Sequence, residues 1–124
     1  MKRILIVDDA ATVRMYHRAI LESAGFAVEE AVNGIEALEK ALATAYDLFL
    51  VDLNMPKMDG YAFLRELRSH CDLAQPPAVM ISTEAELVDR TKAYSAGANF
   101  YIVKPTRPDS LIGHVRVLLG SPPP

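Results

Sequence analysis

Short apolar runs alternate with amphipathic segments along the whole chain, and this alternation repeats about five times. The runs are rich in β-branched residues, as is typical of buried parallel strands, and the segments between them carry apolar residues at helical spacing. The predicted strands lie near residues 3–7, 28–31, 47–51, 78–81 and 99–103. The predicted helices lie near residues 11–24, 34–44, 61–70, 86–96 and 108–119.

Turn residues at the ends of these segments support the division. Gly25 and Gly97 follow alanines at the ends of the first and fourth predicted helices, where a left-handed residue commonly closes a helix. Pro76 and Pro77 prevent the third helix from continuing into the fourth strand. Strands that alternate with helices in this way predict an α/β domain built around a parallel sheet.

Length and composition are those of one globular domain. A chain of 124 residues is large enough for a single packed core. Although 51% of the residues are apolar, no uninterrupted apolar stretch approaches the roughly 18 residues of a membrane span. Met1-Lys2-Arg3 leads into too few apolar residues for a secretory signal. We therefore expect a cytoplasmic protein that does not bind membranes.

Charge and cysteine content exclude further classes of function. The formal net charge is −3 and no cluster of Lys or Arg is longer than a pair, so direct binding to nucleic acid is not expected. Cys71 is the only cysteine, which excludes an internal disulfide. His17, His70 and His114 are widely separated and lack metal-ligand spacing. We interpret these histidines as ordinary surface or boundary residues.

Polar residues follow four of the five predicted strands, at the point where each strand ends. They are Asp8-Asp9, Asp52, Ser82-Thr83 and Lys104-Pro105. Crossover connections bring the carboxyl ends of parallel strands to one edge of a sheet, where ligands of open α/β sheets bind. We therefore expect three carboxylates, a hydroxyl and an ammonium group to converge on one small site.

The three carboxylates predict a site for a divalent cation. Together Asp8, Asp9 and Asp52 would raise one another's pKa values unless a cation balanced them. Mg²⁺ favours oxygen ligands and keeps several waters, and we expect Mn²⁺ to substitute for it. In this interpretation Asp9 and Asp52 ligate directly, Asp8 ligates through water, and the backbone carbonyl of Asn54 adds another oxygen. Calcium is disfavoured because no loop offers enough oxygen atoms.

The remaining polar residues suit transfer of a phosphoryl group. Lys104 would neutralise one phosphoryl oxygen, the Ser82 hydroxyl would donate to another, and the cation would hold a third. Asp52 would attack in line as a nucleophile, which gives an acyl phosphate. Taken singly, an aspartate at a strand end is usually a helix cap or turn former. The joint occurrence of aspartate, serine and lysine residues at four strand ends favours the phosphoryl-transfer site.

At these residues the chain resembles the receiver domain of two-component response regulators, particularly the stand-alone chemotaxis type. The resemblance rests on Ile6-Val7-Asp8-Asp9, on Val51-Asp52-Leu53-Asn54-Met55-Pro56 with Met58-Asp59-Gly60, on Ser82-Thr83, and on Tyr101-Ile102-Val103-Lys104-Pro105. It implies a receiver domain over residues 1–120, and composition alone marks residues 121–124 as a Pro-rich tail. It also implies a doubly wound, flavodoxin-like sheet of five parallel strands in the order 2-1-3-4-5, with five flanking helices.

The same resemblance implies what the domain does and which residues do it. A histidine kinase or histidine phosphotransfer protein would phosphorylate Asp52 with Mg²⁺ at the acidic pocket. The protein would act as a signalling switch that catalyses only its own phosphorylation and dephosphorylation. Ser82 and Tyr101 would be the switch residues. Asn54, Glu84 and Thr83 would tune the rate of dephosphorylation.

The family also implies local structure and binding surfaces. Lys104-Pro105 is expected to be a cis peptide, and Thr106 is a candidate cap for the last helix because Arg107 departs from the usual capping residue. Residues 86–96, 99–103 and 108–119 would form the face that binds a downstream protein or a second copy of the chain. Kinase specificity would lie partly on the first helix, at Thr12, Met15, Tyr16 and Ala19.

Three alternative functions remain open. The first is a receiver-like scaffold that acts without phosphorylation. The second is an aspartate-nucleophile phosphatase, although such enzymes need an acid where this chain has Asn54 and a cap for which it has no spare residues. The third is a flavin-binding module, which Asp8 and Asp9 disfavour because two carboxylates would repel a flavin phosphate.

Overall fold

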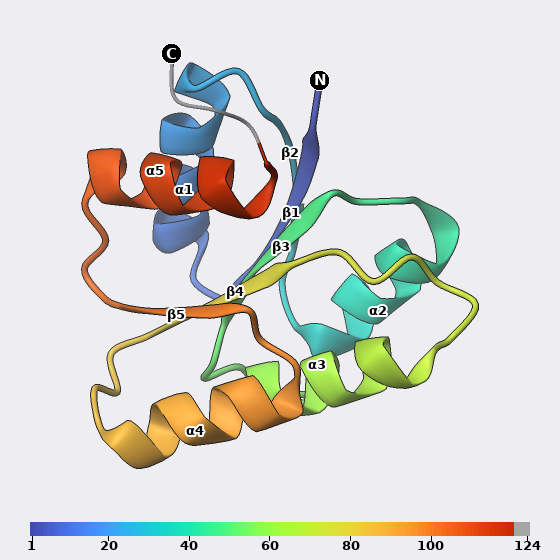
Figure 1. Cartoon of the computed structure of the whole chain (residues 1–124). Helices are drawn as coiled ribbons and strands as arrows, with labels where there is room; N and C mark the ends of the chain where they lie inside the picture. The colour runs from blue at the N-terminus through green and yellow to red at the C-terminus, as the bar shows by residue number, and fades with distance from the viewer. Residues whose placement is uncertain (121–124) are drawn as a thin grey trace.

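The computed structural model describes residues 1–120, and within them five strands alternate with five helices (Figure 1). The strands are β1 (Arg3–Val7), β2 (Ala27–Ala31), β3 (Leu48–Asp52), β4 (Ala78–Ser82) and β5 (Phe100–Val103). The helices are α1 (Ala11–Ser23), α2 (Gly34–Ala43), α3 (Gly60–Ser69), α4 (Leu87–Ala96) and α5 (Pro108–Leu118). The predicted Pro-rich tail at residues 121–124 lies outside the described residues.

The five strands form one parallel sheet in the order β2-β1-β3-β4-β5, which confirms the predicted fold. Val7 pairs with Val51 across β1 and β3, so the aspartates that follow these two residues are neighbours. Ile81 pairs with Asp52 across β3 and β4, which puts Ser82 one residue beyond that pair. The register therefore gathers the polar strand ends at one edge of the sheet.

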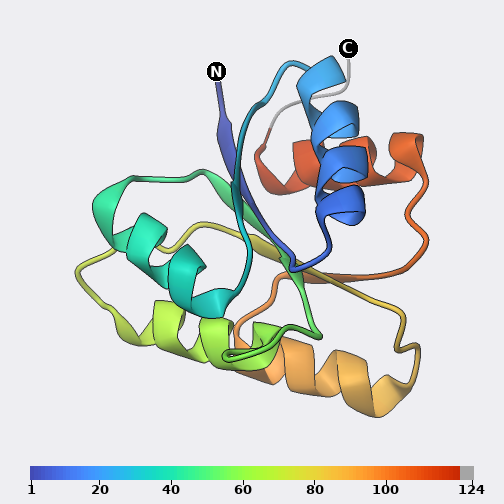
Figure 2. The same cartoon turned by 180° about the vertical axis from the view of Figure 1, so that it is seen from behind.

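Helices cover both faces of the sheet (Figures 1 and 2). α1 and α5 pack on one face, and α2, α3 and α4 pack on the other. Along β1, Leu5 and Val7 belong to the core under α2, α3 and α4, whereas Ile4 and Ile6 belong to the core under α1 and α5. Because both faces are covered, the central strand β1 is apolar at successive positions from Ile4 to Val7.

The helix ends follow the sequence signals closely. The side chains of Asn33 and Asp59 accept hydrogen bonds from the first turns of α2 and α3, as N-cap residues do. Gly97 has a φ of 119° at the end of α4, and Gly25, with a φ of 93°, follows α1. Both glycines therefore adopt the predicted left-handed conformation. Within residues 1–120, no helix combines the length and the hydropathy needed to cross a bilayer.

Two sequence predictions are wrong, one at the start of α5 and one in α1. The N-cap residue of α5 is Arg107, and no side chain caps this end, so Thr106 does not act as a cap. Thr106 is instead buried, and its hydroxyl lies 2.9 Å from Nε2 of His17. His17 is only 3% exposed and is therefore not a surface or boundary residue. Because both side chains are buried away from water, each provides the hydrogen-bond partner that the other needs.

Candidate functional site

The carboxyl edge of the sheet brings together Asp8, Asp9, Asp52 and Lys104. One carboxylate oxygen from each aspartate lies within 4.8 Å of the corresponding oxygens of the other two. Asp8 and Asp52 are buried, with exposed fractions of 3% and 6%, and Asp9 is exposed. The pocket therefore combines two desolvated carboxylates with one that faces solvent.

Lys104 supplies the positive charge in this pocket. Its Nζ lies 2.6 Å from Oδ1 of Asp52 and 3.6 Å from Oδ2 of Asp8. Burial alone would lower the pKa of Lys104, but the hydrogen bond to Asp52 and the charges of Asp52 and Asp8 together raise it. Lys104 is therefore a fixed cation in contact with the carboxylate proposed as the nucleophile.

The pKa of Asp52 is raised despite this contact. Burial is the main cause, and the charges of Asp8 and Asp9 add to it, while the hydrogen bond from Lys104 acts in the opposite direction. One ammonium group thus does not balance the three carboxylates. The donor set consists of oxygen atoms only, so the site fits a hard divalent cation such as Mg²⁺. Asn54 is exposed two residues beyond β3, and its role as a ligand stays a prediction.

Ser82 and Tyr101 are joined through the main chain of Glu84. The buried hydroxyl of Ser82 accepts a hydrogen bond of 3.0 Å from the Glu84 N–H. The Tyr101 hydroxyl donates to the Glu84 carbonyl at 2.7 Å, and the Tyr101 side chain is 2% exposed. The guanidinium carbon of Arg90 lies 5.2 Å from the centre of the Tyr101 ring. Residues 82–84 thus connect the end of β4 to β5.

The segment after β5 is fastened to α1. The Lys104-Pro105 peptide is cis, as predicted. The Tyr16 hydroxyl donates to the Thr106 carbonyl at 2.8 Å, next to the contact between His17 and the Thr106 side chain. A cavity of about 400 Å³ lies beside these contacts, and Thr12, Tyr16, Lys104 and Pro105 contribute to its lining. Helix α1 is therefore linked to the acidic pocket through the segment after β5 that carries Lys104.

Gly60 is a residue of this site that the sequence pointed to only as part of the Met58-Asp59-Gly60 stretch of the resemblance. Its N–H donates to the Leu53 carbonyl at 2.9 Å. A Cβ atom at Gly60 would lie 2.7 Å from the carbonyl oxygen of Asp52 and 3.0 Å from the Cα of Leu53. Because these neighbours are main-chain atoms, they have little freedom to move. An Asp-Gly pair such as Asp59-Gly60 is a turn signal, but it does not indicate this close approach.

We expect Gly60→Ala to lower the free energy of unfolding by about 2 kcal/mol, since the added methyl group overlaps the backbone of β3. Urea denaturation followed by far-UV circular dichroism measures the change. Gly113→Ala in α5 is the matched control, because a Cβ there meets no atom within 4 Å. The control should be stabilised by up to about 1 kcal/mol. Equal stabilisation of both variants would contradict the close approach.

Known proteins are similar to this chain in sequence. The family model of the response regulator receiver domain matches residues 4–116. The transcriptional regulatory protein ResD of Bacillus subtilis is 39% identical over 117 residues, which are 94% of this chain and 48% of that protein. SrrA of Staphylococcus aureus is also 39% identical, over 94% of this chain and 47% of that protein. The chain thus spans about half the length of these curated relatives.

Solved structures of similar sequence have the same fold. The chemotaxis protein CheY4 of Vibrio cholerae is 32% identical, with a TM-score of 0.89 over 95% of this chain and 98% of that one. The receiver domain of the sensor histidine kinase PA1611 of Pseudomonas aeruginosa is 31% identical, with a TM-score of 0.89 over 97% and 98% of the two chains. That structure has a magnesium ion coordinated in its active site cleft. The chain therefore belongs to the response regulator receiver domain family of two-component systems.

Proposed function

We propose that Asp52 of this receiver domain accepts a phosphoryl group from the phosphohistidine of a histidine kinase or histidine phosphotransfer protein, with Mg²⁺ at the acidic pocket. The observation that carries the proposal is the 2.6 Å contact between Lys104 and Asp52 beside the carboxylates of Asp8 and Asp9. A nucleophile, a fixed cation and a set of cation ligands thus share one pocket. This combination is what transfer of a phosphoryl group to a carboxylate requires.

In the transfer step, a carboxylate oxygen of Asp52 attacks phosphorus while the phosphorus–nitrogen bond of the donor breaks. The bonding electron pair goes to the imidazole nitrogen of the donor. Lys104 holds the Asp52 carboxylate in place and offsets negative charge on the phosphoryl oxygens. When bound, Mg²⁺ would supply further positive charge to a phosphoryl oxygen, and Mn²⁺ would serve as a substitute.

Phosphorylation would act on the switch residues through Ser82. The Ser82 hydroxyl already accepts a hydrogen bond from Glu84, so its own hydrogen is free to donate to a phosphoryl oxygen. Movement of Ser82 would displace Glu84, whose carbonyl anchors the Tyr101 hydroxyl. A charge change at the pocket would thereby bias the position of Tyr101 on β5. Asn54, Thr83 and Glu84 are exposed and would tune access of water to the phosphoryl group.

The output surface would be the face formed by α4, β5 and α5. β5 is an edge strand, with α4 and α5 on opposite faces of the sheet beside it (Figure 1). The helices α4 and α5 carry exposed apolar side chains at Leu87, Tyr94 and Val117. Exposed apolar groups together with a formal charge of −3 favour a protein partner or a second copy of the chain over nucleic acid.

The experiment that tests this function is intact-mass measurement after incubation with acetyl phosphate, with and without Mg²⁺. We expect a gain of one phosphoryl group that depends on Mg²⁺ and disappears in Asp52→Ala. Mn²⁺ should replace Mg²⁺ in the same assay. If neither acetyl phosphate nor a phosphorylated histidine phosphotransfer protein modifies the wild type, the domain acts as a scaffold and the proposed transfer is wrong.

A further inference from the structure

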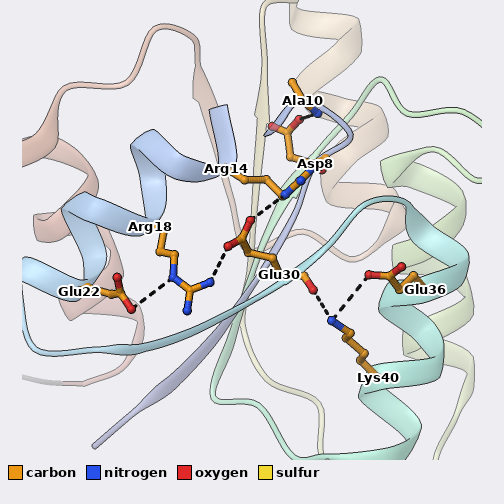
Figure 3. A network of polar contacts seen from close by, with 8 residues as sticks. All are labelled: Asp8, Ala10, Arg14, Arg18, Glu22, Glu30, Glu36 and Lys40. Carbon is orange, nitrogen blue, oxygen red and sulfur yellow. Dashed lines mark hydrogen bonds and ion pairs between the residues drawn. The ribbon is translucent and has the colours of Figure 1, made fainter. Parts of the chain in front are cut away.

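Arg14 of α1 connects the end of β1 to β2 beside the acidic pocket (Figure 3). Its Nη1 donates to the backbone carbonyl of Asp8 at 2.7 Å, and its Nε donates to Oε1 of Glu30 at 2.8 Å. The Arg14 side chain is only 14% exposed. The planar guanidinium group can make both contacts at once because its donors point in fixed directions. Arg14 therefore holds one main-chain group of the pocket in a defined position.

Glu30 is itself held from two helices (Figure 3). Arg18 of α1 donates to its second carboxylate oxygen, and Lys40 of α2 donates to its backbone carbonyl. The hydrogen bonds from Arg18 and Arg14 outweigh desolvation and lower the pKa of Glu30. Glu30 is thus a charged, fixed acceptor that orients Arg14 toward the Asp8 carbonyl.

The Asp8 carbonyl belongs to the peptide group that leads into Asp9. Asp8 is fixed in other ways, because its N–H donates to Ala31 and its carboxylate accepts from the Ala10 N–H. Lys104 contacts the carboxylates of Asp8 and Asp52. The Asp9 side chain is exposed instead. The direction of the Asp9 side chain therefore depends on the peptide plane that Arg14 holds.

We propose that Arg14 is a positioning residue for the cation site: together with Glu30 it fixes the peptide between Asp8 and Asp9 so that the Asp9 carboxylate faces Asp52. This inference rests on the proposed Mg²⁺ site and adds to it a brace that does not touch the cation. Outer contacts that orient metal ligands commonly affect metal affinity by about tenfold or more. We expect an effect of this size for Arg14.

The sign of the effect separates positioning from simple electrostatics. Arg14 is a cation near three carboxylates, so its charge alone opposes binding of Mg²⁺. If Arg14 acted only through this charge, Arg14→Met would tighten binding. If Arg14 positions Asp9, the same substitution weakens binding. Arg3→Met is the matched control, since Arg3 also carries one charge and pairs with a glutamate of β2, Glu29, but lies at the opposite end of β1 from Asp8.

The test is a titration of the ¹⁵N-labelled protein with MgCl₂, followed by amide chemical shifts, for the wild type and both variants. Arg14→Met should raise the dissociation constant for Mg²⁺ about tenfold, and Arg3→Met should change it less than about twofold. Raising the Mg²⁺ concentration should restore most of the rate at which acetyl phosphate modifies Arg14→Met. A protein with a generally damaged pocket would not recover in this way.

Each outcome decides between the hypotheses. Unchanged or tighter Mg²⁺ binding by Arg14→Met would overturn the positioning role and leave the proposed function intact. Equal weakening by both arginine variants would assign the effect to the fold as a whole and overturn the positioning role. If Arg14→Met is unfolded by circular dichroism, Arg14→Lys replaces it, because lysine keeps the charge but lacks the two-pronged donor geometry. A wild type that shows no saturable Mg²⁺ binding would overturn both proposals.

Discussion

Substitution of Lys104 by glutamine is expected to slow phosphorylation of Asp52 by acetyl phosphate by a factor of about 100 to 1,000, at saturating Mg²⁺. In the wild type, the Lys104 ammonium lies 2.6 Å from the Asp52 carboxylate in a buried pocket. Charge interactions are stronger there than in water. Loss of the ammonium group therefore leaves negative charge on the phosphoryl group uncompensated during transfer. Glutamine retains polarity and much of the side-chain length but removes the charge.

The measurement is the rate of mass gain under single-turnover conditions, and Lys92→Gln is the control. Lys92 is an exposed lysine of α4, so its substitution should leave the rate within about twofold of the wild type. Lys104→Gln should also raise the pKa of Asp52 further, because the hydrogen bond from Lys104 acts against burial and the two other carboxylates. A rate unchanged in Lys104→Gln would show that the ammonium does not act in the transfer.

The stability of the protein is expected to fall by about 2 kcal/mol between pH 7.5 and pH 5 because of His17 alone. Burial lowers the pKa of His17 from 6.5 to about 4; the Asp8 charge raises it and the Lys104 charge lowers it. Between these two pKa values the unfolded chain binds a proton at His17 that the folded chain does not. The contribution of His17 to the stability of the fold is therefore fully present above about pH 6.5. It is lost as the pH falls toward 4, and below that pH it changes no further.

Urea denaturation of the wild type and His17→Gln at both pH values isolates this contribution. Other groups also titrate in this range, so the quantity of interest is the difference between the two proteins. Glutamine can still donate to the Thr106 hydroxyl, which is the partner of His17 at 2.9 Å, but it does not titrate. The variant should lose about 2 kcal/mol less than the wild type on acidification. Equal losses would mean that His17 is protonated within the fold.

The residues of the acidic pocket could be predicted because position along a strand and position in space are closely linked in a parallel sheet. Asp8 and Asp52 directly follow or end buried strands that pair, so their proximity follows from topology alone. Lys104 and Ser82 could be assigned to the same edge by the same reasoning. The sequence pattern also determined the order of helices and strands, because both sheet faces are covered and the central strands β1, β3 and β4 are therefore short, mainly apolar runs.

The burial of His17 follows from the spacing of apolar residues along α1. Val13, Ile20 and Leu21 stand at helical spacing from His17, and Ile20 and Leu21 are buried in the core under α1 and α5. This spacing places His17 on the inward face of α1. Its partner could not be found in this way, because Thr106 is 89 residues distant and lies after a cis peptide.

The sequence by itself determined the fold class, the strand ends and the polar residues gathered there. Only the tertiary structure decided which distant groups meet: Glu30 with Arg14, the main chain of β3 with Gly60, and Tyr101 with the carbonyl of Glu84. Periodicity depends on the geometry of a single element and records which of its faces is buried. Contacts between elements depend on register, crossing and side-chain reach, and these are set by the packing of all elements together.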